Sequence, residues 1–375
     1  MIAKFTFEDI TVGAPCAAEP AVAASALPRY VVHVGLPKTG TKYLQYNFWR
    51  LREELRAQGV LYPAEWLRGG AMWAHHDLTE ALTLGPDQRL AETFIRLNAS
   101  GSATILLSSE GFNGLPDVAL QYLRQLTQEA NVEIVFYARR WSDWIPSQWQ
   151  QAVKQGSLQT FPEWYAALLA AGDDHPGINQ ASSLDKFAWA FGRRNIRLVS
   201  YSNLRDHNVD IFDHFCSAIL GLPASAAIKS SGGVVHESMG VFLTELIRCL
   251  NRQEAMRSET SGYQVFEAYQ EVSKSDVLVD DVSTLYGAME RHILEMPLDD
   301  DLQSFADAYE RLNDYRGQLV SPQFGGNVFE KRRTQCRSVR PDFLMEGEAL
   351  AAMRRIWDAV RQRLSATSPT QATPP

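Results

Sequence analysis

The stretch YVVHVGLPKTGTKYLQYNF, residues 30–48, decides the fold, because a short apolar run leads through a loop into an amphipathic pattern. Residues 30–34 are apolar without alternation, which is typical of a strand in a parallel sheet covered on both faces. Apolar residues then recur at helical steps of four, three and four, at Leu44, Phe48, Leu51 and Leu55. Gly59 stands where this helix should end. The stretch therefore predicts a strand, a loop and a helix in direct succession.

Three more apolar runs share this character, and helical patterns separate them. They are residues 103–107 (ATILL), 132–137 (VEIVFY) and 196–201 (IRLVSY). Alternation of strands and helices predicts βαβ units, and hence an α/β fold with a P-loop-type three-layer αβα arrangement around a central parallel sheet. In the helix expected after residues 132–137, Asp143 is the predicted N-cap and Pro146 falls in the first turn.

The remaining chain divides by composition into four predicted parts. Residues 29–225 form the α/β core, and residues 226–364, mainly helical in pattern, form a C-terminal extension packed on it. Residues 1–28, rich in Ala, Pro and Val, are interpreted as a loose lead-in segment. Residues 365–375 lack side chains to bury and are predicted to be a disordered tail.

Composition narrows the classes of partner. The chain of 375 residues carries 36 Lys and Arg against 44 Asp and Glu, a net charge of −8, which disfavours a broad nucleic-acid surface. No apolar run is long enough to span a membrane. The four cysteines lie far apart, as in proteins of the reducing cytosol. We expect a cytoplasmic protein without nucleic-acid partner or transmembrane segment; transient membrane contact and the oligomeric state are left open.

The loop at residues 35–42, GLPKTGTK, has the composition of a phosphate-binding loop. Glycines let backbone N–H groups point inward, the following helix N-terminus adds partial positive charge, and Lys38 adds a full one. The spacing departs from the nucleotide-triphosphatase loop, which would need lysine where Thr41 stands. The strand at 132–137 is followed by Arg139 and Arg140, where a magnesium-binding acid would be needed. We therefore predict a phosphate-bearing donor used without a metal ion.

The motif PKTGTKYL resembles the 5′-phosphosulfate loop of the sulfotransferases, which use 3′-phosphoadenosine 5′-phosphosulfate (PAPS). Eukaryotic cytosolic enzymes of this family carry P-K-S-G-T-T-W, and heparan-sulfate-type enzymes carry K-G-G-T-R. Lys42 resembles the basic residue that ends the second motif. The chain as a whole looks like a bacterial member of the family. The resemblance implies that Lys38 is the catalytic lysine and that Tyr43 flanks the adenine. It also implies that N–H groups and hydroxyls hold the 5′-phosphate, from Thr39, Gly40, Thr41 and Lys42.

A second motif of the family places an arginine at the end of a strand and a serine eight residues later, both on the donor's 3′-phosphate. Arg139 and Ser147 have this spacing, and Asp143 matches an aspartate that the family carries between them. Arginine binds phosphate through its planar fork, and a serine in the first turns of a helix can donate its hydroxyl. The resemblance covers residues 30–222, and the family's C-terminal R-K-G element is not recognisable.

Sulfuryl transfer also needs a base that takes the proton of the accepting hydroxyl. Glu110 is the predicted base, because it follows the apolar run at 103–107 and so lies at the carboxyl edge of the sheet, where such folds place active sites. Members of the family place a catalytic Glu or His near this position. His75 and His76 are the rival candidates.

These observations predict a PAPS-dependent sulfotransferase, without a metal requirement, that acts on a hydroxyl of a carbohydrate or lipid-linked acceptor. A P-loop kinase and a catalytically inactive nucleotide-binding partner protein are the alternatives. A basic run at residues 331–340 is interpreted as solvated surface, with approach to an anionic acceptor or to the 3′-phosphate as the second interpretation.

Overall fold

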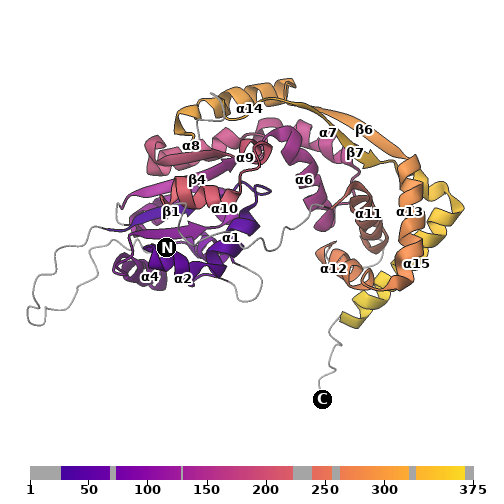
Figure 1. The fold of residues 1–375 in the computed structure, drawn as a ribbon, viewed down its shortest axis with the longest axis horizontal. Coiled ribbons are helices and arrows are strands. Elements are labelled where there is room, and N and C mark those ends of the chain that lie inside the picture. Colours follow the sequence, from indigo (N-terminus) through magenta and orange to yellow (C-terminus); the bar gives the residue numbers. More distant parts are fainter. Residues whose placement is uncertain are drawn as a thin grey trace, which may run out of the picture.

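The computed structural model centres on a five-stranded, wholly parallel sheet (Figure 1). The structure describes residues 27–67, 73–127, 130–222, 239–255, 262–320 and 327–367. The strands are β1 (Arg29–His33), β2 (Val60–Leu61), β3 (Thr104–Ser108), β4 (Val132–Ala138) and β5 (Ile196–Ser200). Their order is β2-β3-β1-β4-β5, so β1 lies at the centre. The predicted α/β fold with a central parallel sheet is confirmed.

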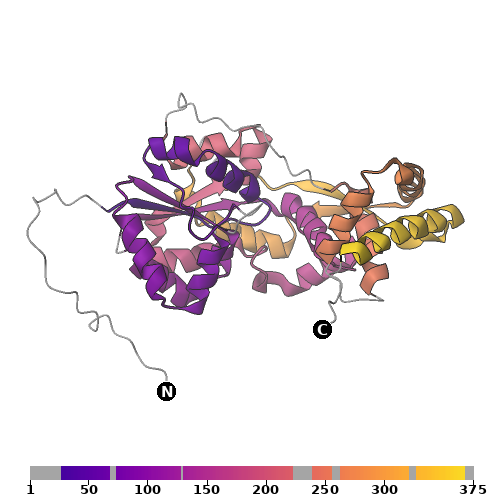
Figure 2. The ribbon, with the colours of Figure 1, turned by 90° about the horizontal axis from the view of Figure 1, so that it is seen from below.

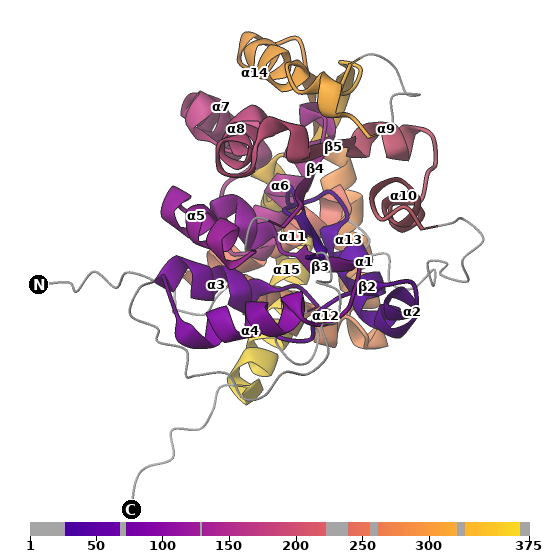
Figure 3. The ribbon, with the colours of Figure 1, turned by 90° about the vertical axis from the view of Figure 1, so that its left-hand side faces the viewer.

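Helices cover both faces of the sheet, because successive residues of each strand alternate between two apolar cores. Tyr30 and Val32 pack into one core and Val31 into the other. Figure 3 shows the two helical layers on either side of the sheet. One layer holds α3 (His76–Leu84), α4 (Gln88–Asn98), α5 (Asp117–Leu126) and α8 (Gln180–Phe191). The other holds α1 (Thr41–Arg50), α2 (Arg52–Ala57), α9 (Tyr201–Asp206) and α10 (Ile211–His214).

Each of the four predicted strands lies within one residue of its expected position. The helix expected from residue 44 to Gly59 is instead two helices, α1 and α2, that meet at Leu51, whose backbone leaves the helical range at φ −102° and ψ 22°. Gly59, in the left-handed region at φ 79°, turns the chain into β2, which the sequence did not indicate. β2 pairs only with β3, at the edge of the sheet.

Helix α6 (Trp141–Lys154) follows β4 and carries much of the site. Its N-cap is Arg140, so the prediction of Asp143 as the N-cap is wrong. Asp143 lies in the first turn and accepts hydrogen bonds from Arg140 (3.0 Å) and Ser202 (2.9 Å), which explains the carboxylate at this position. Pro146 is inside the helix and not in its first turn.

The C-terminal extension is mainly helical, as predicted, and adds a two-stranded antiparallel ribbon. Its helices are α11 (Val241–Ala255), α12 (Gly262–Val272), α13 (Val279–Arg291), α14 (Gln303–Asn313) and α15 (Gly347–Thr367). The ribbon consists of β6 (Ile293–Asp299) and β7 (Arg333–Val339). Strand β6 links α13 to α14, and α14 packs on α8, so the extension returns to the α/β part (Figures 1 and 2). Helix α7 (Phe161–Ala171) lies between α6 and α8 in the sequence of the α/β part.

Parts of the predictions lie outside the described residues. Residues 1–26 of the expected lead-in segment and residues 368–375 of the expected tail are among them. Helix α15 continues to Thr367, three residues into the segment expected to be disordered. Cys216, Cys249 and Cys336 are buried free thiols. Across the described ranges, the helices are too short or too polar to cross a bilayer.

Candidate functional site

The loop between β1 and α1 lies at the carboxyl edge of the sheet and has an unusual backbone conformation. Gly35, Lys38 and Gly40 all have left-handed φ angles, of 91°, 68° and 76°. Thr39, between the last two, is not among the residues with a positive φ, and alternation of hand of this kind is the pattern by which backbone nests bind anions. A non-glycine residue in the left-handed region is uncommon, and such backbone strain is more frequent at functional sites than elsewhere, which makes this loop a candidate site.

The N-terminus of α1 has no side-chain cap. Gly40 is its N-cap, and the first turn carries no acidic residue. The two threonine hydroxyls of the loop are engaged elsewhere: Thr39 donates to Leu36 O (2.6 Å) and Thr41 donates to Glu110 Oε1. The backbone N–H groups at the start of α1 therefore remain for an anion, which the helix dipole also favours.

The Lys38 ammonium projects into a group of cations. Its Nζ donates to Gln151 Oε1 on α6 at 2.6 Å. Burial lowers the pKa of Lys38 to about 8, and repulsion from neighbouring cations adds to the effect. These cations are, in decreasing order, Lys154, Lys42 and Arg139. The positive charges of the site are thus gathered around one spot, where an anion would relieve their repulsion.

Arg139, directly after β4, is buried and has spare donor capacity. Its Nη1 donates to Lys38 O, whereas its Nε has no hydrogen-bond partner among the described residues. Gln180 fixes its backbone from both sides, accepting from the N–H (3.2 Å) and donating to the carbonyl (2.7 Å). Its guanidinium lies 5.4 Å from the Tyr201 ring. Burial lowers the pKa of Arg139 to about 10, and the attraction of Tyr201 and Asp143 offsets this only in part.

Arg140, its neighbour, is a structural cation. Its guanidinium pairs with Asp143 (3.0 Å) and Asp206 (2.9 Å), and its Nε donates to Glu330 O (2.7 Å). The two adjacent arginines thus differ: Arg140 is paired with two acids, whereas the Nε of Arg139 has no partner among the described residues. Ser147 is half-buried on α6, one turn before Gln151 and on the same face.

Glu110 lies immediately after β3, against the loop. Its carboxylate accepts hydrogen bonds from the Thr41 hydroxyl and from Gln45 Nε2 (3.3 Å). A Cβ on Gly35 would lie 3.3 Å from Glu110 Cγ, so the glycine permits this close packing. Burial disfavours the charged carboxylate, but these hydrogen bonds and the nearby His33 outweigh it and hold the pKa of Glu110 below its usual value. Glu110 is therefore ionised at neutral pH and able to accept a proton.

The two rival histidines differ in availability. Both ring nitrogens of His75 are engaged, since Nε2 donates to Pro63 O (2.9 Å) and Nδ1 accepts from Ser108 N–H (3.0 Å). Burial lowers the pKa of His75 to about 4, so it stays neutral. His76 is partly exposed, with Nδ1 3.0 Å from Ser109 Oγ, next to Glu110.

Two other predicted elements have protein partners. The Tyr43 hydroxyl donates to Asp210 Oδ2 at 2.7 Å, at the start of α10. The side chains of the basic run form ion pairs with acids, as expected of a solvated surface. These pairs are Lys331–Asp301 (3.4 Å), Arg332–Asp206 (2.7 Å), Arg333–Asp299 (2.5 Å) and Arg337–Glu295 (3.9 Å).

The structure adds Gln151 and Lys154 to the site, which the sequence analysis missed. Both lie on the α6 face that begins at Ser147, four and seven residues further on. Their spacing places them on the face of Ser147, because residues at i, i+4 and i+7 share one face of a helix, but it does not indicate which element that face meets. Within the described ranges, no three His, Cys, Asp or Glu side chains gather as a metal-ligand group.

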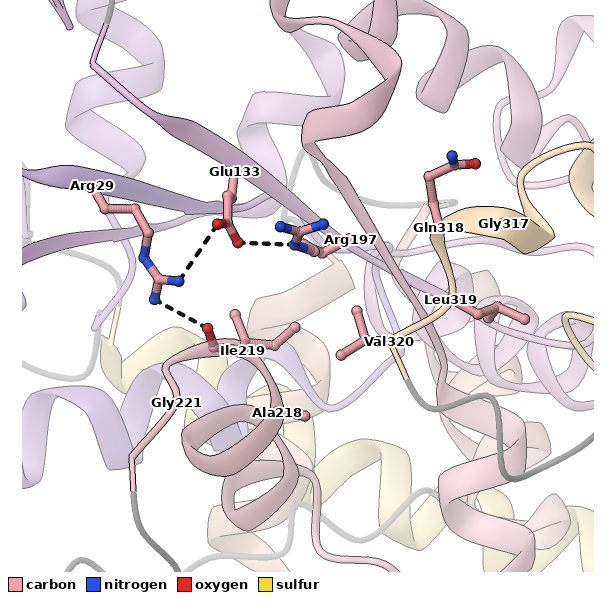
Figure 4. A pocket seen from close by; sticks show the side chains of 10 residues that line it. All are labelled: Arg29, Glu133, Arg197, Ala218, Ile219, Gly221, Gly317, Gln318, Leu319 and Val320. Atoms are coloured by element: carbon pink, nitrogen blue, oxygen red, sulfur yellow. Dashed lines mark hydrogen bonds and ion pairs between the residues drawn. The ribbon is translucent and has the colours of Figure 1, made fainter.

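A cavity of about 410 Å³ lies at the opposite edge of the sheet, where β1, β4 and β5 begin (Figure 4). Its charged side chains satisfy one another: Glu133 pairs with Arg29 (3.5 Å) and with Arg197 (3.0 Å). Arg29 also donates to Ile219 O at 3.1 Å. The cavity is thus remote from Lys38, Arg139 and Glu110, which the sheet brings together at its carboxyl edge.

Comparisons with known proteins give one structural similarity of note. The crystal structure of a sulfotransferase from Alicyclobacillus acidocaldarius is similar with a TM-score of 0.34 and 16% sequence identity, over 56% of this chain and 87% of that one. No family model and no curated protein matches the chain.

Proposed function

We propose that this protein is a sulfotransferase that moves the sulfuryl group of PAPS to a hydroxyl of a carbohydrate or glycolipid. The observation that carries the proposal is the excess of positive charge at the loop, where Lys154, Lys42 and Arg139 repel Lys38 and only the Glu110 carboxylate attracts it. An uncapped helix N-terminus, Lys38 with a lowered pKa, and Arg139 with an unpartnered buried Nε all surround one spot. This combination suits a ligand with two separated anionic groups.

Each group has a role on the donor. The N–H groups of Thr41 and Lys42 hold the 5′-phosphate, and Arg139 and Ser147 hold the 3′-phosphate. Lys38 lies where negative charge grows on the leaving phosphate oxygen during in-line displacement, and a preorganised cation there stabilises the transition state. The hydrogen bond from Lys38 to Gln151 keeps the ammonium in place before the donor binds.

Glu110 is the proposed general base. It is ionised, and it lies at the carboxyl edge of the sheet beside the loop. His76 is the competing candidate, since its ring reaches Ser109 beside Glu110. His75 is disfavoured, because a base needs a free lone pair and both of its nitrogens are engaged.

We propose that different parts of the chain bind the donor and the acceptor, with the boundary at about residue 225. The α/β part, residues 29–225, binds the donor, and the helical part, residues 226–364, closes the acceptor side. Helix α6 connects the two, since it carries Ser147 and also packs against α11 and α12.

Transfer of radiolabelled sulfate from PAPS to a panel of glycans and glycolipids tests the proposal. Label in an acceptor, undiminished by a chelator, supports it. Phosphate transfer from ATP that stops on chelation would instead identify a kinase. Tight binding of 3′,5′-phosphoadenosine without transfer to any acceptor would identify an inactive nucleotide-binding protein.

A further inference from the structure

We propose that Lys154, assisted by Lys42, binds an anionic group of the acceptor, so that the substrate is an acidic carbohydrate. This inference rests on the proposed function and names its substrate class. It starts from the order of side chains along α6. Ser147, Gln151 and Lys154 follow one another on the face that meets Lys38.

That order matches the direction from donor to acceptor. Ser147 is assigned to the 3′-phosphate end, and Gln151 contacts the lysine at the sulfuryl end. At 1.5 Å per residue, Lys154 lies about 4–5 Å further along the helix axis than Gln151. It therefore stands beyond the transferred group, on the side from which a hydroxyl must attack in line.

The charge of Lys154 is not neutralised by an acid in the described part of the chain. In the described part of the chain, neither its ammonium nor that of Lys42 has a hydrogen-bond or ion-pair partner. Burial lowers the pKa of Lys154, and repulsion from Lys42 adds to this. The donor already has the α1 amides, Lys38 and Arg139, so two further ammonium groups remain for another anion.

The C-terminal extension holds Lys154 in position. Its Nζ lies 4.7 Å from the centre of the Phe266 ring on α12, a cation–π contact. The adjacent backbone is clamped as well: Asn251 donates to Val153 O at 2.7 Å, and Gly156 lies so close to Gly262 that a Cβ on it would be 3.2 Å from the Gly262 Cα. Lys154 is thus a half-buried cation fixed between the donor loop and the extension.

A matched pair of glycosides tests the inference. The probes are 4-nitrophenyl β-D-glucuronide and 4-nitrophenyl β-D-glucoside. They differ only at C6, which is a carboxylate in the glucuronide and a hydroxymethyl group in the glucoside. Calorimetry with protein saturated in 3′,5′-phosphoadenosine should show that the glucuronide binds at least tenfold more tightly than the glucoside, because a charge-assisted hydrogen bond lowers Kd by about this factor. The same preference should appear in kcat/KM for transfer.

Substitutions locate the effect. Lys154→Gln should remove most of the preference, Lys154→Arg should retain part of it, and neither should change the affinity for 3′,5′-phosphoadenosine. Lys274→Gln is the matched control, because Lys274 pairs with Glu271 on the surface of the extension. It should leave every value unchanged.

Three results would overturn the inference: equal binding of the two glycosides, no binding of either, or loss of nucleotide affinity in Lys154→Gln. The last would place Lys154 in the donor site. Failure of the nucleotide itself to bind would count against the proposed function and not against the anion site. Glucuronide titration of the nucleotide-free protein tests that site by itself.

Discussion

Replacing Arg139 by glutamine should weaken the binding of the donor's 3′-phosphate and leave the binding of its 5′-phosphate unchanged. Arg139 is the only residue assigned to the 3′-phosphate that carries a full charge, and AMP lacks that phosphate. The variant should therefore lose affinity for 3′,5′-phosphoadenosine and keep its affinity for AMP. Glutamine retains a polar side chain of similar reach, so the change removes charge more than volume.

The contacts of Arg139 determine how much affinity for 3′,5′-phosphoadenosine the variant should lose. One N–H of Arg139 donates to Lys38 O, and its Nε has no partner in the described part of the chain, so the prediction counts one new contact and not the full guanidinium fork. A hydrogen bond to a charged group contributes about 1.5–3 kcal/mol, which corresponds to roughly 10- to 150-fold in Kd. Ser147→Ala removes a neutral donor and should cost about 1 kcal/mol, or roughly fivefold.

Isothermal titration of both nucleotides into wild type and variants measures these values. Arg337→Gln on β7, whose side chain is 3.9 Å from Glu295, is a surface control and should titrate like wild type. Equal affinity of the wild type for the two nucleotides would refute the assignment of Arg139. So would a variant that loses both nucleotides equally, because the arginine would then act through the conformation of Lys38.

Three further outcomes follow from the loop and its neighbours. Lys38→Ala should reduce transfer roughly a hundredfold or more, with the melting temperature and circular dichroism spectrum retained as evidence of folding. Glu110→Gln should reduce turnover by about 10²–10⁴ and leave nucleotide affinity nearly unchanged, whereas His76→Asn should be active; the reverse pattern would assign the base to His76. Because the pKa of Lys38 is about 8, its charge is present below that pH and lost above it, so kcat/KM for PAPS should fall as pH rises through 8. Lys38→Arg, if it retains activity, should lack this fall.

The sequence indicated the sheet well because most residues of its strands are apolar and buried. Every residue of β3 and β4 is buried, and such runs have no competing interpretation as surface. β2 was missed because it has two residues and exists through its pairing with β3. β6 was missed for another reason: it is half-exposed and contains Glu295 and Pro297, so its apolar pattern is weak.

The site was predictable to the extent that parallel strands end at one edge. Lys38, Glu110 and Arg139 follow three neighbouring strands, and the sheet alone brings them together. Contacts made by α6 were not predictable, because they depend on the direction in which that helix leaves β4. Gln151 and Lys154 became visible only when the helix was seen to run past Lys38.

The charge distribution of the chain links these site residues to one another. A chain with a net charge of −8 nevertheless gathers Lys38, Lys42, Arg139 and Lys154 around one loop. Their mutual repulsion, together with burial, destabilises the free protein, and it has no benefit to folding. Such a cost is retained at functional sites, where a bound anion converts repulsion into attraction without reorganising the protein. The electrostatic free energy that this repulsion costs the free protein is therefore recovered on binding: Lys38 and Arg139 attract the donor, and Lys42 and Lys154 attract the anionic group of the proposed acceptor.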